Sequence, residues 1–256
     1  QDDLREALID SIQHHLVADV PVGFFLSSGL DSTALTALAT EMISDLHTVT
    51  LGFREYQGTE KDEVPLAESV AHHYGTNHQT EWIKKEEFAE ELPHLLKAMD
   101  QPTIDGVNSY FVSKVTAATG LKVAVSGIGG DELFGGYPSF RQIPKIVRQL
   151  RPLARLSPVG KLARLVSAPL VKRMTSPKYA GVFEYGGTYG GAYFLRRSLF
   201  MPWELPQLLE KETCKEGLEK LQTMNRLQET TANIKNDHLK VSALELEWYM
   251  RNQLLR

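Results

Sequence analysis

The stretch Val22-Gly23-Phe24-Phe25-Leu26-Ser27-Ser28-Gly29-Leu30-Asp31-Ser32 joins an apolar run to a turn of small residues. Residues 22–26 are typical of a buried strand, and residues 32–42 are typical of a helix. A turn at this place lets backbone amide groups and the positive end of the helix dipole face a phosphate. Serine and aspartate also cap helices, so Ser-Gly-x-Asp-Ser alone leaves both interpretations open. The preceding strand favours the phosphate site.

The same alternation of strand and helix continues along the first half of the chain. Strands are expected over residues 46–53, 78–83 and 122–126, and helices over residues 63–74, 85–99 and 108–119. Such a pattern predicts an α/β fold with a doubly wound, mostly parallel sheet. Ligands bind such sheets at the carboxyl ends of the strands, which is where the first turn lies.

A second glycine-rich turn follows the strand expected at residues 122–126. It reads Ser126-Gly127-Ile128-Gly129-Gly130-Asp131-Glu132-Leu133-Phe134-Gly135-Gly136-Tyr137, with five glycines among residues 126–136. Mg²⁺ is commonly held by one or two carboxylates together with phosphate oxygens, so Asp131 and Glu132 are candidates to share a metal ion with Asp31. The alternative is an ordinary acidic turn.

Together the two turns resemble known motifs. The first resembles the PP-loop, Ser-Gly-Gly-x-Asp-Ser, of the N-type ATP pyrophosphatases. The second resembles the asparagine synthetase signature Ser-Gly-Glu-Gly-x-Asp-Glu-x-Phe-Gly-Gly-Tyr. The chain is therefore similar to the C-terminal synthetase domain of glutamine-hydrolysing asparagine synthetases. The resemblance implies a Rossmann-like sheet of the adenine nucleotide alpha hydrolase type followed by C-terminal helices, and it covers most of residues 1–140.

The resemblance also implies roles for individual residues. Asp31 and Asp131 would hold Mg²⁺, and Asp31, Asp131 and Glu132 would be catalytic. The residues expected to bind ATP are Leu26, Ser27, Ser28, Gly29, Asp31, Ser32, Leu51, Ser126 and Gly127.

Three departures from the family pattern are present. Ser28 replaces the first glycine of the PP-loop, which bears on the affinity for phosphate. Ile128 replaces a glutamate of the signature, which bears on the substrate. Residues 105–109, beginning with Asp105, stand where well-studied members carry Arg-Ala-Ser-Thr, so no arginine is available there to clamp an acidic substrate. Aspartate is therefore not assured as the substrate, and the carboxylate stays open.

The composition changes after Tyr137. No Asp or Glu occurs from Leu133 to Phe183, whereas ten Lys and Arg do. We expect an ATP-pyrophosphatase core over residues 1–140 and a helical, basic extension over residues 141–256. The basic stretch either forms a solvated helical face or attracts a phosphorylated or polyanionic substrate. The aromatic and glycine-rich residues 185–193 are either a lid or ordinary packing.

The ends of the sequence suggest a piece of a longer protein. The chain starts at Gln1, and the amphipathic helix expected over residues 241–256 has no capping residue. An N-terminal glutaminase domain, whose nucleophile in the family is its first residue, a cysteine, is expected to be missing, since only Cys214 occurs and charged neighbours suggest a surface position. Ammonia would come from that domain, and the piece alone is expected to be catalytically incomplete.

Composition narrows the partners further. The 256 residues are 42% hydrophobic, carry a net charge of −4 and contain no apolar run of membrane-spanning length. These values disfavour nucleic acid and membrane partners, and the single cysteine fits a reducing cytoplasm. The histidine pairs at residues 14–15 and 72–73 lack metal-site spacing and are expected on the surface. A homodimer is compatible with these features.

The predicted reaction is amide formation from a small carboxylate, through an acyl-AMP intermediate with release of pyrophosphate. Two alternatives stay open. One is another adenylating PP-loop enzyme, such as a synthetase that closes an amide ring or an enzyme that modifies tRNA. The other is a degenerate nucleotide-binding scaffold, for which Ser28 and Ile128 are the motivation.

Overall fold

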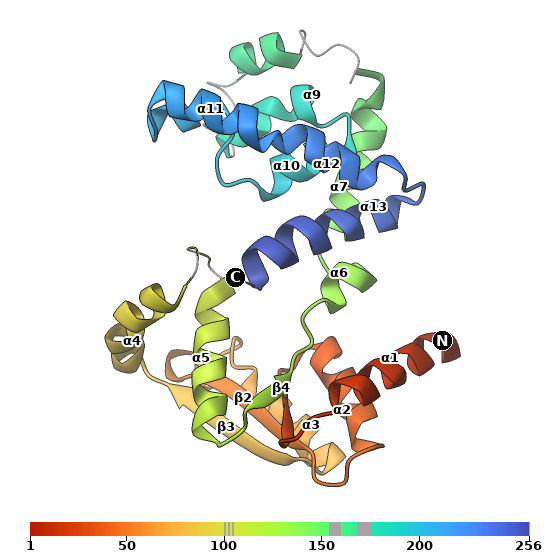
Figure 1. The fold of residues 1–256 in the computed structure, drawn as a ribbon, viewed down its shortest axis with the longest axis vertical. Helices are drawn as coiled ribbons and strands as arrows, with labels where there is room; N and C mark the ends of the chain where they lie inside the picture. The colour runs from red at the N-terminus through yellow and green to blue at the C-terminus, as the bar shows by residue number, and fades with distance from the viewer. Residues whose placement is uncertain (100, 102, 104, 154–159, 168–175, 256) are drawn as a thin grey trace. The chain divides into compact units, whose positions relative to one another are not determined.

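A computed structural model describes residues 1–256 except residues 100, 102, 104, 154–159, 168–175 and 256 (Figure 1). The chain divides into two compact units, one formed by residues 1–130 with 253–256 and the other by residues 131–252. The division lies close to the change in composition after Tyr137. The assignment of functional domains to residues 1–140 and 141–256 stays a prediction.

The first unit contains a four-stranded parallel sheet. Its strands are β1 (Val22–Phe25), β2 (His47–Phe53), β3 (Asn77–Ile83) and β4 (Val123–Val125). They lie in the order β3-β2-β1-β4, and every neighbouring pair is parallel. The predicted α/β fold with a parallel sheet is therefore confirmed.

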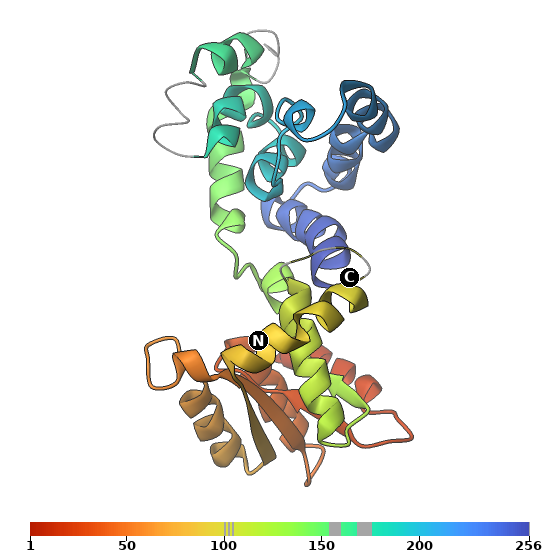
Figure 2. The same cartoon turned by 90° about the vertical axis from the view of Figure 1, so that its left-hand side faces the viewer.

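Helices cover both faces of this sheet (Figures 1 and 2). They are α1 (Asp2–His15), α2 (Leu30–Thr40), α3 (Val64–Tyr74), α4 (Lys85–Ala98) and α5 (Asp105–Ala118), with a 3₁₀ turn at Arg54–Tyr56. Every helix predicted in this region is present. Helix α1 was not predicted, because only Ile12 of its residues is buried and the apolar periodicity is correspondingly weak.

The two faces have separate hydrophobic cores, because successive strand side chains point to opposite sides. One cluster packs α1 and α2 against β1 through Ile12, Val22, Phe24, Ala39 and Leu46. A smaller cluster packs α3 against the end of β1 through Leu26, Ala67 and Ala71. The other face is packed by α4 and α5 through Val49, Ile83, Leu95, Phe111 and Val115.

The strand order contains a topological switch point. From β1 the chain adds β2 and then β3 on one side, and it returns to place β4 on the other side of β1. In open parallel sheets, ligands bind at the carboxyl ends of the two strands that flank such a switch point, which here are β1 and β4. Both glycine-rich turns follow these strands.

The second unit is helical. It comprises α6 (Gly130–Phe134), α7 (Ser139–Leu150), helical residues 160–167, α9 (Val182–Tyr185), α10 (Tyr189–Arg197), α11 (Lys211–Leu221), α12 (Thr223–Ala232), α13 (Asp237–Leu244) and a π-helix (Glu245–Leu254), with 3₁₀ turns at Arg151–Leu153, Pro177–Gly181 and Leu205–Gln207. The predicted C-terminal helix thus departs from α-helical geometry at Glu245. None of the helices in the described residues has the length and apolar character to cross a membrane.

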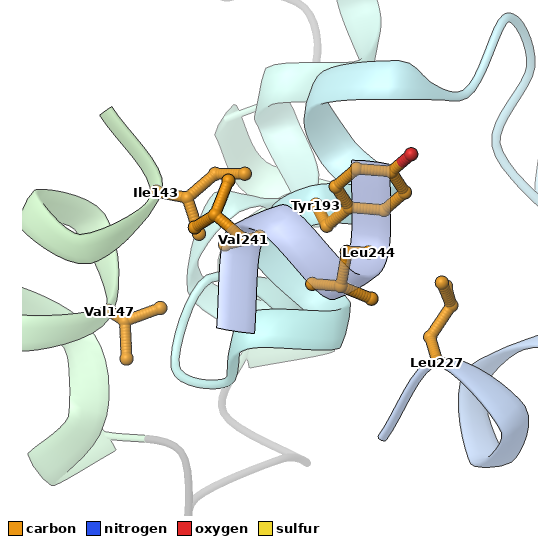
Figure 3. Packing of buried hydrophobic residues seen from close by; sticks show 7 residues of the cluster. Ile143, Val147, Tyr193, Leu227, Val241 and Leu244 are labelled. Atoms are coloured by element: carbon orange, nitrogen blue, oxygen red, sulfur yellow. The ribbon is translucent and has the colours of Figure 1, made fainter. Parts of the chain in front are cut away.

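Helices α7, α10, α12 and α13 share one hydrophobic core (Figure 3). Tyr193 lies in it at 3% exposure, and the backbone of Gly190 packs against Leu227 of α12. These contacts support packing rather than a lid for residues 185–193. The surface position expected for Cys214 is wrong, since α11 turns this thiol inward and leaves it 6% exposed. Both histidine pairs are exposed, as predicted.

A buried ion pair joins α10 to the π-helix. Glu245 is fully buried, and its Oε2 lies 2.9 Å from Nη2 and 3.0 Å from Nε of Arg197. Its Oε1 accepts a hydrogen bond of 2.6 Å from the Ser139 hydroxyl. Burial lowers the pKa of Arg197, but the Glu245 carboxylate outweighs burial and the net shift is upward. The guanidinium also covers the Tyr249 ring at 3.6 Å.

His78 on β3 is expected to make the stability of the first unit depend on pH. Its Nδ1 lies 2.9 Å from Thr48 Oγ1, and burial lowers its pKa while Glu68 partly opposes the shift. The unfolded chain therefore binds the His78 proton more tightly than the folded chain does. The stability contributed by neutral His78 is present above a pH of about 6.5 and is lost as the pH falls below it. Thermal unfolding between pH 7.5 and 5.5 should show a steeper loss of Tm for the wild type than for His78→Gln. The exposed His15→Gln serves as the control, and equal slopes in all three proteins would contradict the expectation.

Candidate functional site

The first turn is closed on itself by two serine hydroxyls. Ser32 Oγ lies 2.9 Å from Ser27 Oγ, 3.2 Å from the Ser27 amide nitrogen and 3.1 Å from the Gly29 carbonyl oxygen. The Gly29 amide donates to Ser27 Oγ at 3.0 Å. These bonds shape the entry into α2, whose first amide groups have no partner within the helix. Ser27, Gly29 and Ser32 are therefore brought together in one turn, and their contact with ATP stays a prediction.

Ser28 is accommodated without backbone strain. Among the described residues other than glycine, only Gln222 has a positive φ. A side chain at position 28 therefore meets none of the conformational cost that makes glycine necessary in many turns. Gly29 also has an ordinary φ of −70°. Ser28 therefore fits this turn in an ordinary backbone conformation.

The second turn lies against the start of α2 and depends on glycine to do so. A Cβ atom added at Gly127 would lie 3.1 Å from the Ser32 amide nitrogen and 3.3 Å from Asp31 Cβ. A Cβ atom at Gly130 would collide with the Asp31 carboxylate. Gly129 has a φ of +100°, which only glycine adopts easily. Because these glycines have no side chains, the turn after β4 can lie against the turn after β1.

Gly130 is a candidate site residue that was not among the predicted ones. It was recognised as part of a glycine-rich turn, but its role in making room for the half-buried Asp31 carboxylate depends on the distance between two turns far apart in the sequence. The glycine run was the available signal. Ser126 Oγ accepts a hydrogen bond of 3.3 Å from the Ile128 amide, so it helps to shape the same turn.

The two leucines predicted to contact ATP, Leu26 and Leu51, mainly stabilise the packing of the sheet. Leu26 is 2% exposed, its amide donates to the Val49 carbonyl at 2.9 Å, and its carbonyl accepts from Thr50 Oγ1 at 2.5 Å. Leu51 is half-buried and packs with the cluster that contains Phe111. Their contact with a nucleotide stays a prediction.

The two carboxylates that follow Gly130 belong to the second unit. Asp131 fills the space beside Gly136, and its carbonyl accepts from the amides of Gly135 and Gly136 at 3.0 and 3.1 Å. Glu132 is 1% exposed and accepts a hydrogen bond of 2.9 Å from the Tyr137 hydroxyl. Burial, reinforced by this bond, raises the Tyr137 pKa and keeps its proton in place. The catalytic role of Glu132 and the sharing of a metal ion between Asp31 and Asp131 stay predictions.

The residues that depart from the family pattern are placed as follows. Ile128 is 47% exposed, so its apolar side chain lies at the surface of the glycine-rich turn. Asp105 is the first residue of α5, and its amide donates to Thr103 Oγ1 at 3.3 Å. Within the described part of the chain, no three His, Cys, Asp or Glu side chains gather as a metal site. A metal ion bound between the two glycine-rich turns would be coordinated by only a few protein carboxylates.

Comparison with known proteins supports the family resemblance of the two glycine-rich turns. The family model described as asparagine synthase matches residues 3–256. The chain is 37% identical over 175 residues to asparagine synthetase [glutamine-hydrolyzing] 1 of Bacillus subtilis, an alignment that covers 67% of this chain and 26% of that protein. It is 38% identical over 176 residues to a putative asparagine synthetase [glutamine-hydrolyzing] of Mycobacterium tuberculosis, covering 68% and 26%.

A third relative, asparagine synthetase B [glutamine-hydrolyzing] of Escherichia coli, is 30% identical over 162 residues, which is 56% of this chain and 28% of that protein. The chain thus spans about a quarter of the length of these curated relatives. The match to the family extends through the helical unit as well as the sheet. The chain belongs to the asparagine synthase family.

Proposed function

We propose that this chain is the synthetase part of an ATP-dependent, amide-forming ligase. The observation that carries the proposal is the meeting of two glycine-rich turns on the first turn of α2, at the switch point between β1 and β4. Relatives named as glutamine-hydrolysing asparagine synthetases support this reaction class. Ligands of open parallel sheets bind at such a point.

In the proposed reaction, a carboxylate oxygen of the substrate attacks the α-phosphorus of ATP. A bond forms between that oxygen and phosphorus while the bond from phosphorus to the pyrophosphate oxygen breaks, which gives acyl-AMP and pyrophosphate. Ammonia then attacks the acyl carbon, AMP leaves, and a proton is lost to give the amide. The amide groups at the start of α2 and the hydroxyls of Ser27 and Ser32 would hold the departing pyrophosphate.

The donor set suits a magnesium ion bound largely through the nucleotide. Asp31 is half-buried beside the turn, and Asp131 is the covalent neighbour of Gly130, so these two carboxylates would hold the ion. When bound, Mg²⁺ would supply positive charge that neutralises the pyrophosphate oxygens. Leu26 and Leu51 would border the adenosine through their backbone or exposed edge.

Ile128 distinguishes the proposed substrate from the one in the relatives' names. An isoleucine transfers no proton, and it presents an apolar, half-exposed side chain where the family pattern has glutamate. We therefore propose a small carboxylate without commitment to aspartate. Ile128 also motivates the alternative of a nucleotide-binding scaffold, whereas the unstrained backbone of Ser28 counts against loss of phosphate binding.

Exchange of labelled pyrophosphate into ATP tests the first half-reaction. We expect exchange that depends on Mg²⁺ and on one member of a panel of small carboxylates, with AMP and an amide formed when ammonia is added. The panel should include aspartate and longer or less polar acids. Tight ATP binding without exchange for any acid, in the full-length protein, would favour the scaffold instead.

A further inference from the structure

The second unit contains a pocket of about 350 Å³ that none of the predicted ATP-binding residues lines. Its walls come from the end of α7, the entry to α10 and the connection between α12 and α13. Its polar lining consists mainly of Arg148, Arg151, Thr188, Tyr189, Asp237 and Lys240. The volume lies at the small end of the range for ligand sites, which indicates a small metabolite.

The charge of the pocket favours an anion. Three cations, Arg148, Arg151 and Lys240, face one carboxylate, Asp237, so the lining carries a net charge of 3 − 1 = +2. Arg148 and Arg151 stand three residues apart at the end of α7, a spacing at which like charges repel on a helix. Neither arginine forms an ion pair within the described residues. A bound anion would relieve this repulsion.

The one carboxylate among the described lining residues lies beside Tyr189. Burial raises the Tyr189 pKa, the neighbouring Asp237 carboxylate raises it further, and Lys240 Nζ lies 4.7 Å from the centre of the Tyr189 ring. Thr188 caps α10 by accepting from the Gly191 amide at 3.1 Å, so the positive end of this helix also points toward the pocket. The arginines and this helix end therefore both contribute positive charge to the pocket.

Part of the lining is apolar. Pro144, Val147 and Ile234 contribute to the wall, and Val147 also belongs to the core of the unit (Figure 3). Because that core is closely packed, this wall has a fixed shape. A ligand that fits the whole lining has an anionic end for the arginines and an apolar or ring-shaped part for this wall.

We propose that this pocket binds a small phosphate monoester that carries an aromatic or apolar group. Two guanidinium forks and an ammonium group match the several oxygens and double charge of such a phosphate. The inference assigns a use to part of the acid-free basic stretch, since Arg148 and Arg151 belong to it. It is independent of the proposed ligase reaction.

Calorimetric titration with phenyl phosphate tests the site, with phenol as the uncharged comparison. We expect Arg148→Gln/Arg151→Gln to weaken phenyl phosphate binding at least tenfold, because charged hydrogen bonds are lost. Asp237→Asn should strengthen it severalfold by removing the one negative charge among the described lining residues. The matched control is Arg141→Gln/Lys145→Gln, which removes the same charge from exposed positions of α7 outside the pocket and should leave the affinity unchanged.

Independence from the ATP site is checked with the same proteins. The arginine pair should leave ATP affinity unchanged, whereas Asp31→Asn should leave phenyl phosphate affinity unchanged. All variants replace exposed or half-buried side chains, and circular dichroism verifies folding. The proposal is overturned if phenol binds as well as phenyl phosphate, if both double variants lose affinity equally, or if Asp31→Asn abolishes phenyl phosphate binding.

Discussion

Asp31→Asn is expected to lower the rate of AMP formation by about 10²–10³, because it removes the charge beside the pyrophosphate that leaves. Asparagine has nearly the same shape, so the hydrogen bonds between Ser27 and Ser32 should persist. The measurement is carboxylate-dependent AMP release from ATP in the full-length protein. Asp45→Asn, an exposed aspartate before the amino end of β2, is the control and should be as active as the wild type.

A companion change tests the same carboxylate through its neighbour. Gly130→Ala adds a methyl group that would collide with the Asp31 carboxylate and displace it. The loss of AMP formation should approach that of Asp31→Asn, and the two changes together should lose little more than either alone. Gly217→Ala, where a Cβ atom meets no neighbour, should have no effect on the rate. Full activity in both Asp31→Asn and Gly130→Ala would show that the Asp31 carboxylate takes no part in the proposed reaction.

Arg197→Met is expected to destabilise the second unit by about 3–5 kcal/mol, because it leaves the Glu245 carboxylate buried without its partner. Urea unfolding followed by circular dichroism would show a lower midpoint with an unchanged slope. Combining Arg197→Met with Glu245→Met should recover most of the loss, since an apolar pair tolerates burial.

The exposed ion pair of α11 provides a matched comparison for this experiment. Lys220 Nζ lies 2.6 Å from Glu216 Oε1, but both side chains are mostly exposed to solvent. Water screens such pairs, so Lys220→Met should change the midpoint little. If Arg197→Met were as harmless as Lys220→Met, the buried pair would contribute no more than a surface pair does.

The sheet could be predicted because its strands carry local signals. β1 is a short apolar run, and β2 is rich in Thr, Val and Phe, which favour strands. Residues 185–193 were harder, since glycines normally interrupt helices. Here the lack of side chains at Gly190 and Gly191 lets α10 pack closely on its neighbours, so tertiary contact outweighs low helix propensity.

The candidate site could be predicted in part for the same reason. Ser27, Asp31 and Gly127 stand in two motifs that can be read locally. The support that Gly130 gives to Asp31 depends on the pairing of β1 with β4, which no local pattern specifies. The cationic pocket was beyond prediction, because Arg148 and Asp237 come to line one pocket only through the folding of four helices.

The pairing of Val22 with Val123 also sets the order in which the protein can assemble during its synthesis. β1, β2 and β3 follow one another closely and can pair as soon as each has left the ribosome. β4 arrives about a hundred residues after β1, and contacts between such distant segments form slowly because a long loop must be closed. The two glycine-rich turns therefore cannot meet on a nascent chain that ends before Gly130. Nucleotide binding would accordingly begin only after β4 and the turn that follows it have been made.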